Sequence, residues 1–245
     1  MPKFFLPDSP IYTLGDTIKI DGEDAFHITH TLRMNIGERV VFTSSDGTEY
    51  ETQIVSIEKT ELFLSVTGVS QNQTEPRIYS RLFQALAKGD KMETVIQKSV
   101  ELGVSEIYPV ESSRCVVQLD DKRAEKKLER WQKIAKEAAK QCGRGIIPKV
   151  FPPISYADAL VEMKKSDISF ICYETSIKNN PKALLSQKDF NSVAFFIGPE
   201  GGISPSEIEL AHSLGIPDIT LGKLILRTET ASSAVLSMIL YEKEF

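Results

Sequence analysis

The spacing of apolar residues changes near residue 74, and this change restricts the fold more than any other feature. Before it, apolar and polar residues alternate in four short segments, "TIKI", "ERVVFTS", "EYETQIVSI" and "ELFLSVTGV". Alternation with a period of two is typical of half-buried strands, and turns rich in Gly, Asp and Ser separate the segments. One amphipathic helix, from about Glu23 to Met34, interrupts them. The pattern predicts a small β-barrel over residues 1–73.

The stretch "SQNQTEPR", residues 70–77, has no apolar periodicity and contains Pro76, so it predicts a linker. After it, short apolar segments alternate with amphipathic helices. Such alternation predicts an α/β domain over residues 74–245, with a mostly parallel sheet covered on both faces. Ligands of open parallel sheets bind beyond the carboxyl ends of the strands. We therefore expect three loops that follow strands, "CYETS", "GPEGG" and "LGKLILRTET", to converge on one pocket.

The segment "FFIGPEGGISPSEIEL", residues 195–210, joins a strand, a glycine-rich bend and a helix start. Ser204, Pro205 and Glu207 match the N-cap, first position and capping box of a helix. The glycines before them would let a ligand approach the backbone. The bend matches neither the Walker nor the dinucleotide pattern, and Glu200 would repel a phosphate. The residues alone leave two interpretations, a ligand site or an ordinary tight connection.

Basic residues gather in the middle of the chain. The formal net charge of -5 argues against indiscriminate coating of nucleic acid. Residues 1–70 carry 5 Lys and Arg against 11 Asp and Glu, whereas residues 77–149 carry 16 against 10. Steps of three and four along one predicted helix align a basic stripe. It comprises Lys122, Lys126, Arg130, Lys133, Lys136, Lys140 and Arg144. Interleaved glutamates leave open whether it binds phosphates or is a solvated face.

Several classes of protein are disfavoured by what the sequence lacks. The cysteines form no CxxC pair, and no Cys or acidic cluster joins the few histidines, so we expect no metal. We also expect a cytoplasmic protein with no membrane segment, because no apolar run approaches the roughly 20 residues of a span. No Ser-His-Asp set indicates a hydrolase.

Five segments, in order, resemble the bacterial 16S rRNA (uracil-N3) methyltransferases of the RsmE type, in the knotted SPOUT superfamily. They are "LFQALAKGDKMETVIQKSVELGV", "SSRCVV", "IAKEAAKQCGR", "FFIGPEGG" and "LRTETA". The resemblance covers nearly the whole chain; "GPEGG" followed by "LRTETA" is its most specific part, and "HITHTLRM" is a weaker match. It implies a PUA-like N-terminal barrel, a SPOUT domain with a deep C-terminal trefoil knot, S-adenosylmethionine as cofactor and a homodimer. It further implies methylation at N3 of one uridine of 16S rRNA within the 30S subunit, during ribosome maturation.

The resemblance also places candidate residues. Cofactor contacts are expected at Gly198, Pro199, Glu200, Gly201, Gly202, Leu221, Gly222, Leu226 and Thr228. RNA contacts are expected at Arg33, Lys126, Arg130, Lys133, Lys140 and Arg144.

Uridine N3 loses its proton only well above neutral pH, so the site must stabilise an anion and take up a proton. Arg227 and Arg114 are candidates for the first task, and Glu200 and Glu229 for the second. A structural ion pair is the alternative for Arg114, and a helix-start carboxylate is the alternative for Glu229. Because N3 lies on the Watson-Crick edge, the uridine must be unpaired or extruded.

Two other functions stay open at this stage. A non-catalytic RNA-binding assembly factor could keep the same fold, although the intact cofactor loop disfavours it. A knotted methyltransferase could instead act on tRNA or on ribose 2'-hydroxyl groups, although the order of the motifs disfavours that reading.

Overall fold

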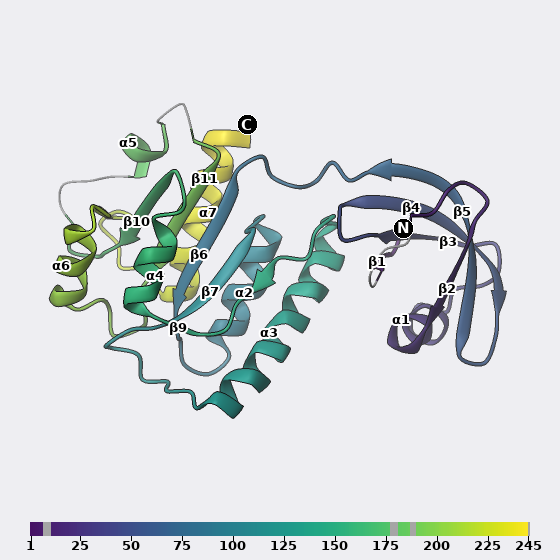
Figure 1. Ribbon diagram of the computed structural model, residues 1–245, viewed down its shortest axis with the longest axis horizontal. Helices are drawn as coiled ribbons and strands as arrows, with labels where there is room; N and C mark the ends of the chain where they lie inside the picture. Colours follow the sequence, from purple (N-terminus) through teal and green to yellow (C-terminus); the bar gives the residue numbers. More distant parts are fainter. Residues whose placement is uncertain (7–10, 177–180, 187–189, 245) are drawn as a thin grey trace. The chain divides into compact units, whose positions relative to one another are not determined.

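The computed structural model describes residues 1–6, 11–176, 181–186 and 190–244. The chain divides into two compact units (Figure 1). The first consists of Met1–Glu75 and Ala139–Ile147, and the second of Pro76–Ala138 and Pro148–Phe245.

The first unit contains a five-stranded sheet in the order β1-β3-β4-β5-β2. Its strands are β1 (Lys3–Phe5), β2 (Thr17–Asp21), β3 (Arg39–Thr43), β4 (Thr48–Ile57) and β5 (Glu61–Gln71). Strand β1 runs parallel to β3, and the other pairs are antiparallel. Ile18 and Ile20 point inward as the alternation predicts, together with Leu62 and Leu64. In the described part of the chain β1 and β2 are edge strands, so the small β-barrel expected is, in the structure, a half-barrel sheet.

The helix expected from Glu23 to Met34 is shorter in the structure, and it changes from α-helix to π-helix along its length. It comprises α1 (Gly22–Phe26) and one π-helical turn, η1 (His27–Thr31). Ala25 and Ile28 face the core, as an amphipathic segment requires. The helix ends before Arg33, whose φ of 54° is left-handed.

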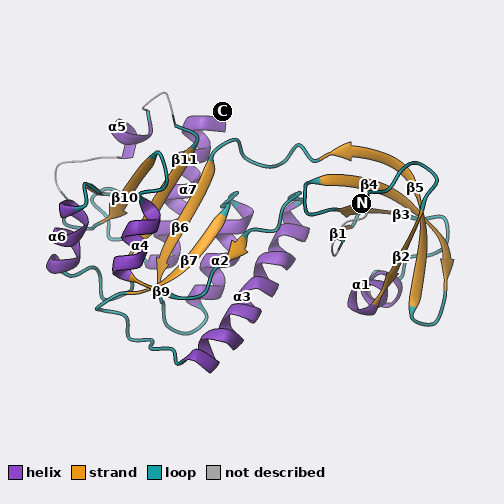
Figure 2. Cartoon of the chain, in the orientation of Figure 1, coloured by secondary structure: helices purple, strands orange, loops and turns teal. Residues whose placement is uncertain are grey.

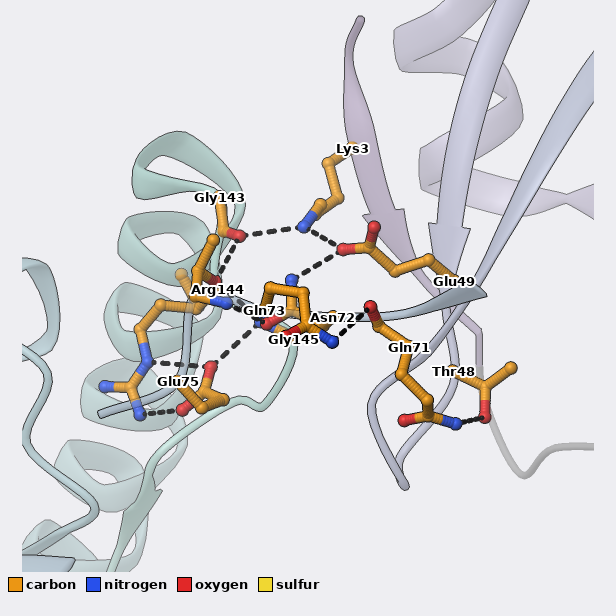
Figure 3. Close-up of polar contacts among 12 residues, drawn as sticks. Lys3, Thr48, Glu49, Gln71, Asn72, Gln73, Glu75, Gly143, Arg144 and Gly145 are labelled. Atoms are coloured by element: carbon orange, nitrogen blue, oxygen red, sulfur yellow. Dashed lines mark hydrogen bonds and ion pairs between the residues drawn. The ribbon is translucent and has the colours of Figure 1, made fainter. Parts of the chain in front are cut away.

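Ala139–Ile147 belongs to the first unit because side chains tie it there, as Figure 3 shows. Arg144 is only 5% exposed, and its Nη2 lies 2.7 Å from Oε2 of Glu75. The ammonium of Lys3 donates a 2.8 Å hydrogen bond to the carbonyl of Gly143. The stretch expected to be a linker therefore includes a residue, Glu75, that anchors a distant loop.

The second unit contains a parallel sheet in the order β12-β10-β11-β6-β7-β8, with β9 paired to β7. Its strands are β6 (Tyr79–Ala85), β7 (Glu106–Glu111), β8 (Lys149–Val150), β9 (Ile154–Ser155), β10 (Ile168–Cys172), β11 (Ser192–Ile197) and β12 (Asp218–Ile219). The parallel pairing and the intervening helices confirm the α/β class.

Helices cover both faces of this sheet (Figure 2). They are α2 (Lys91–Glu101), α3 (Asp121–Cys142), α4 (Tyr156–Met163), α5 (Pro181–Leu185), α6 (Pro205–Ser213) and α7 (Thr228–Glu244). Phe83 and Ala85 of β6 pack in one apolar cluster with α4 and α6. Gln84 points to the opposite face, where its amide reaches Thr228 of α7.

The last part of the chain turns back across the sheet. Strand β12 pairs with β10 at the sheet edge, and β11 lies between β10 and β6. Residues 220–227 then lead back from that edge, and α7 packs against α2, β6 and β11. This return brings the loop before α7 to the carboxyl ends of β10 and β11.

Candidate active site

A cavity of about 310 Å³ lies where the strands β10, β11 and β12 end. Its lining residues come mainly from the three loops that follow these strands: 172–174, 197–200, 202–203 and 220–228, together with Lys91 and Ala231. The loops "CYETS", "GPEGG" and "LGKLILRTET" therefore converge, as expected for an open parallel sheet.

The glycine-rich bend is held by the start of the following helix. Ser204 caps α6 and forms the expected capping box with Glu207. The other carboxylate oxygen of Glu207 accepts a 2.8 Å hydrogen bond from the amide of Ser113 in the loop after β7. Burial opposes the charge of Glu207, but the hydrogen bonds from Ser113 and Ser204 outweigh it and lower its pKa below the ordinary value. This buried carboxylate therefore joins two loops beside the cavity.

A second hydrogen-bonded link joins the bend to the last loop. The Thr228 hydroxyl donates to the carbonyl of Gly198 at 2.8 Å. It also accepts a 2.8 Å hydrogen bond from the side-chain amide of Gln84. Because Thr228 begins α7, these bonds set the position of the last loop relative to the bend.

Most residues expected to contact a cofactor line the cavity. They are Gly198, Pro199, Glu200, Gly202, Leu221, Gly222, Leu226 and Thr228. Gly201 does not line it: a Cβ there would lie 3.2 Å from both Cβ and the carbonyl oxygen of Arg114. Its lack of a side chain therefore makes room for Arg114. Gly222 has a φ of +121° with open space around it, so its backbone conformation is the reason for glycine there.

Large apolar side chains are exposed at the cavity. Leu224 and Ile225 line it and are 81% and 85% exposed. Apolar side chains beside a cavity of this size suit a ligand with a flat, weakly polar ring.

The two candidate arginines differ in their surroundings. Arg227 lines the cavity, and within the described residues its guanidinium makes no hydrogen bond or ion pair. Arg114 lies outside the lining, and its Nη1 donates a 3.1 Å hydrogen bond to the carbonyl of Gly201. Among the described residues Arg114 forms no ion pair, so its contacts do not support the alternative of a structural ion pair.

The two candidate proton acceptors are both poorly suited to that task. Oε1 of Glu200 lies 2.9 Å from Nζ of Lys91 and accepts a 3.1 Å hydrogen bond from the amide of Lys88. Burial opposes its charge, but these partners outweigh it, so its pKa is lowered and its affinity for a proton is reduced. Glu229 is half-buried in the first turn of α7, outside the cavity lining.

Several side chains of the lining were not predicted as site residues, among them Lys91, Glu174 and Cys172. Lys91 lies in the first segment of the family resemblance, and Glu174 lies in the "CYETS" loop. The sequence thus indicated both segments but did not indicate these two residues as part of the site. Cys172 is the third, and burial raises the pKa of its thiol, which keeps it neutral.

The side chains of the basic stripe differ in exposure and in their contacts. Lys126 and Lys133 are exposed, and Arg130 is exposed although its Nη2 lies 2.7 Å from Oε2 of Glu93. Lys140 lies 2.8 Å from Asp24, and Arg144 is buried against Glu75. These last two therefore have structural partners, and the RNA contacts expected at Lys140 and Arg144 stay a prediction. Arg33, in the other unit, is exposed.

Family models match both units. An RNA methyltransferase domain matches residues 74–240, and an RNA methyltransferase PUA domain matches residues 20–67. The chain is 38% identical over 233 residues to ribosomal RNA small subunit methyltransferase E of Bacillus subtilis, covering 93% of this chain and 91% of that protein. The chain belongs to this family.

Solved structures extend the family comparison to the whole fold. A ribosomal RNA small subunit methyltransferase E from Neisseria gonorrhoeae, bound to S-adenosyl methionine, superposes with a TM-score of 0.90 at 32% identity, covering 98% of this chain and 97% of that one. A putative methyltransferase from Legionella pneumophila, in complex with the same cofactor, gives 0.89 at 32% identity with the same coverage.

Two further observations concern the described residues only. They contain no helix whose length and apolarity would suffice to cross a bilayer. They also contain no group of three or more His, Cys, Asp and Glu side chains placed to hold a metal ion.

Proposed function

We propose that this chain transfers a methyl group from S-adenosylmethionine to N3 of one uridine in 16S rRNA, in the cytoplasm and within the small ribosomal subunit. The observation that carries the proposal is the cavity formed by "GPEGG" and "LGKLILRTET" together. Support also comes from family membership and from relatives solved with this cofactor.

The residues of the cavity fit the cofactor. The exposed side chains of Leu224 and Ile225 suit the face of an adenine ring, and the bend from Gly198 to Gly202 offers backbone groups to its polar edge. A neutral adenine and a sulfonium cation bring no phosphate, so the carboxylate of Glu200 repels neither. The sulfonium supplies an activated methyl group.

The chain's own contribution is to position the uracil and to favour its anion. Arg227 lines the cavity, and its guanidinium has no partner among the described residues, so it is placed to stabilise negative charge on the base. Alignment of N3 with the methyl group supplies much of the remaining rate. The uridine reaches the cavity unpaired or extruded from its helix.

Binding of the RNA involves both parts of the chain in this proposal. Residues 1–73 hold RNA, with Arg33 in contact, and residues 74–245 carry out the transfer. Lys126, Arg130 and Lys133 on α3 bind phosphates. The family resemblance adds two structural features to the proposal: the return of the chain into α7 forms a deep trefoil knot, and two copies form a homodimer.

One experiment tests the reaction. The protein is incubated with labelled S-adenosylmethionine and 30S subunits that lack modification, and the methylated nucleoside is identified by mass spectrometry. We expect 3-methyluridine at a single position of 16S rRNA, with less or none on tRNA. Excess S-adenosylhomocysteine, which competes for the cavity, serves as the control. Label in a ribose 2'-hydroxyl group or in tRNA would favour a different methyltransferase, and binding without label would favour an assembly factor.

A further inference from the structure

We propose that Glu174 accepts the proton of uridine N3, with the Arg114 guanidinium beside it stabilising the base. This assignment rests on the proposed function, because the proton that Glu174 accepts is that of uridine N3. Glu174 lies in the loop after β10 and lines the cavity.

The other carboxylates near the cavity are not suited to this role. The lining contains two glutamates, Glu174 and Glu200. Glu200 is paired with Lys91 and hydrogen-bonded by the Lys88 amide. Glu174 is exposed, and the described residues give its carboxylate no hydrogen bond or ion pair. Among the cavity carboxylates, Glu174 is therefore the one that has no hydrogen-bond or ion-pair partner among the described residues.

A positively charged group, the guanidinium of Arg114, lies near the carboxylate of Glu174. A Cβ on Gly202 would lie 2.8 Å from Oε1 of Glu174 and 3.7 Å from Nη1 of Arg114. The carboxylate and the guanidinium therefore reach the same point beside the bend, from loops after β10 and β7. Arg114 is held there by its hydrogen bond to the Gly201 carbonyl. Gly202 also has a φ of +71°, so both conformation and space require glycine.

This arrangement is complementary to one edge of uracil. The Watson-Crick edge presents the N3–H donor between two carbonyl acceptors, O2 and O4. A carboxylate accepts the N3–H hydrogen bond, and a guanidinium donates to a neighbouring carbonyl, where the negative charge collects after the proton leaves. Cytosine, whose N3 is an unprotonated acceptor, would repel the carboxylate, so the pair also selects the base.

The step balances without another reactant. The N3–H bond breaks, its electron pair stays on N3 and the proton moves to a Glu174 oxygen. The same pair forms the N–C bond to the methyl carbon, whose bond to sulfur breaks with its electron pair left on sulfur. The neutral Glu174 carboxyl then releases its proton to solvent, which reaches it because the side chain is exposed.

Other charged groups also face the reaction. Lys91, Glu200, Lys223 and Arg227 line the same cavity as Glu174, and Arg114 approaches from the loop after β7. The cations outnumber the carboxylates. Their field favours the uridine anion.

The test compares Glu174→Gln with Glu200→Gln in single-turnover assays on 30S subunits lacking modification, from pH 6 to pH 10. For Glu174→Gln we expect the rate near pH 7 to fall by roughly 10²- to 10⁴-fold, the range for loss of a general base. The rate should then rise with pH toward that of wild type, because hydroxide replaces the missing base. Glu174→Asp should restore part of the rate. Glu200→Gln should keep the wild-type shape of the profile.

Calorimetry with S-adenosylhomocysteine and filter binding with 30S subunits supply readouts other than activity. Both affinities should be unchanged in Glu174→Gln, because the carboxylate acts on the proton. Pronounced loss of S-adenosylhomocysteine affinity with a wild-type pH profile would overturn the assignment and make Glu174 a cofactor-holding residue. A wild-type rate and profile in Glu174→Gln would also overturn it, while 3-methyluridine made by wild type would leave the proposed function standing. If wild type makes a different product, both proposals are wrong.

Discussion

The Thr228 hydroxyl donates a 2.8 Å hydrogen bond to the carbonyl of Gly198, and this bond connects the first residue of α7 to the start of the glycine-rich bend. The same oxygen accepts from the buried amide of Gln84 in β6. One hydroxyl thus fixes a strand, a bend and a helix relative to one another at the wall of the cavity. Removal of the hydroxyl leaves the buried Gln84 amide and the partly buried Gly198 carbonyl without this partner.

Thr228→Ala should therefore lower both stability and cofactor affinity. We expect a loss of about 1–3 kcal/mol in the free energy of unfolding, because buried partners are left unsatisfied. Denaturant titration measures the stability, and calorimetry with S-adenosylhomocysteine measures the affinity. Thr230→Ala is the matched control, because Thr230 is exposed in the same helical turn. Thr228→Ser, which keeps the hydroxyl, should restore most of both quantities; equal losses in Ser and Ala variants would contradict this role.

Glu207 should contribute a pH-dependent part of the stability. Its pKa is lowered by hydrogen bonds from Ser113 and Ser204, which outweigh its burial. A depressed folded-state pKa gives stability that is complete above the ordinary value of 4.5 and is lost as pH falls through the folded-state pKa. The difference in unfolding free energy between wild type and Glu207→Gln should thus be constant from pH 6 to pH 7 and shrink below pH 4.5. A difference that grows in acid would reverse the assigned sign.

The buried pair of Arg144 and Glu75 should matter more than an exposed pair. Glu75→Gln removes the negative charge that Glu75 places beside the buried Arg144 guanidinium, and we expect a loss of roughly 3 kcal/mol in the stability of the first unit. Glu61→Gln, which breaks the more exposed pair with Lys19 in the same unit, is the control and should cost less than about 1 kcal/mol. Hydrogen exchange of the amides of Gly145 and Ile146, which donate to Glu75, reports the local effect. Equal protection in both variants would show that the pair is not an anchor.

Charge reversal of the exposed part of the stripe should weaken RNA binding. Lys126→Glu with Lys133→Glu removes two phosphate contacts in the proposed complex, so 30S affinity should fall and its dependence on salt should flatten. Affinity for S-adenosylhomocysteine should not change. The control, Lys164→Glu with Lys165→Glu, makes the same change of charge at the end of α4. If both double variants behave alike, only net charge matters and the stripe is a solvated face.

Arg227→Lys should slow the reaction more than it weakens RNA binding. Lysine keeps the positive charge but loses the planar fork that can hold a base anion by two hydrogen bonds. In single-turnover assays with cofactor and 30S subunits saturating, the rate of the variant should recover as pH rises, because solvent then favours the anion. Loss of S-adenosylhomocysteine affinity instead would place Arg227 among the cofactor contacts, and parallel pH profiles would move the anion-stabilising role to Arg114 alone.

Short-range sequence patterns determined the strands and helices, and with them the edge of the sheet at which the candidate site lies. The alternation of Ile18 and Ile20 predicted an inward-facing strand, and Ser204 with Glu207 predicted the helix start, because both patterns depend on neighbouring residues. The convergence of three loops followed from the rule that parallel strands end at one edge of their sheet. Sequence resemblance, and not periodicity, supplied the cofactor and the reaction.

Only the tertiary structure decided which charged groups are free and which are paired. Glu200, a candidate base, lies 2.9 Å from Lys91, and Arg144, a candidate phosphate ligand, is buried against Glu75. Glu174 drew no attention in the sequence, yet it keeps an open carboxylate in the cavity. The physical reason is that the protonation and availability of a side chain depend on atoms within a few ångströms. Those atoms come from residues far away in the chain, which no local pattern encodes.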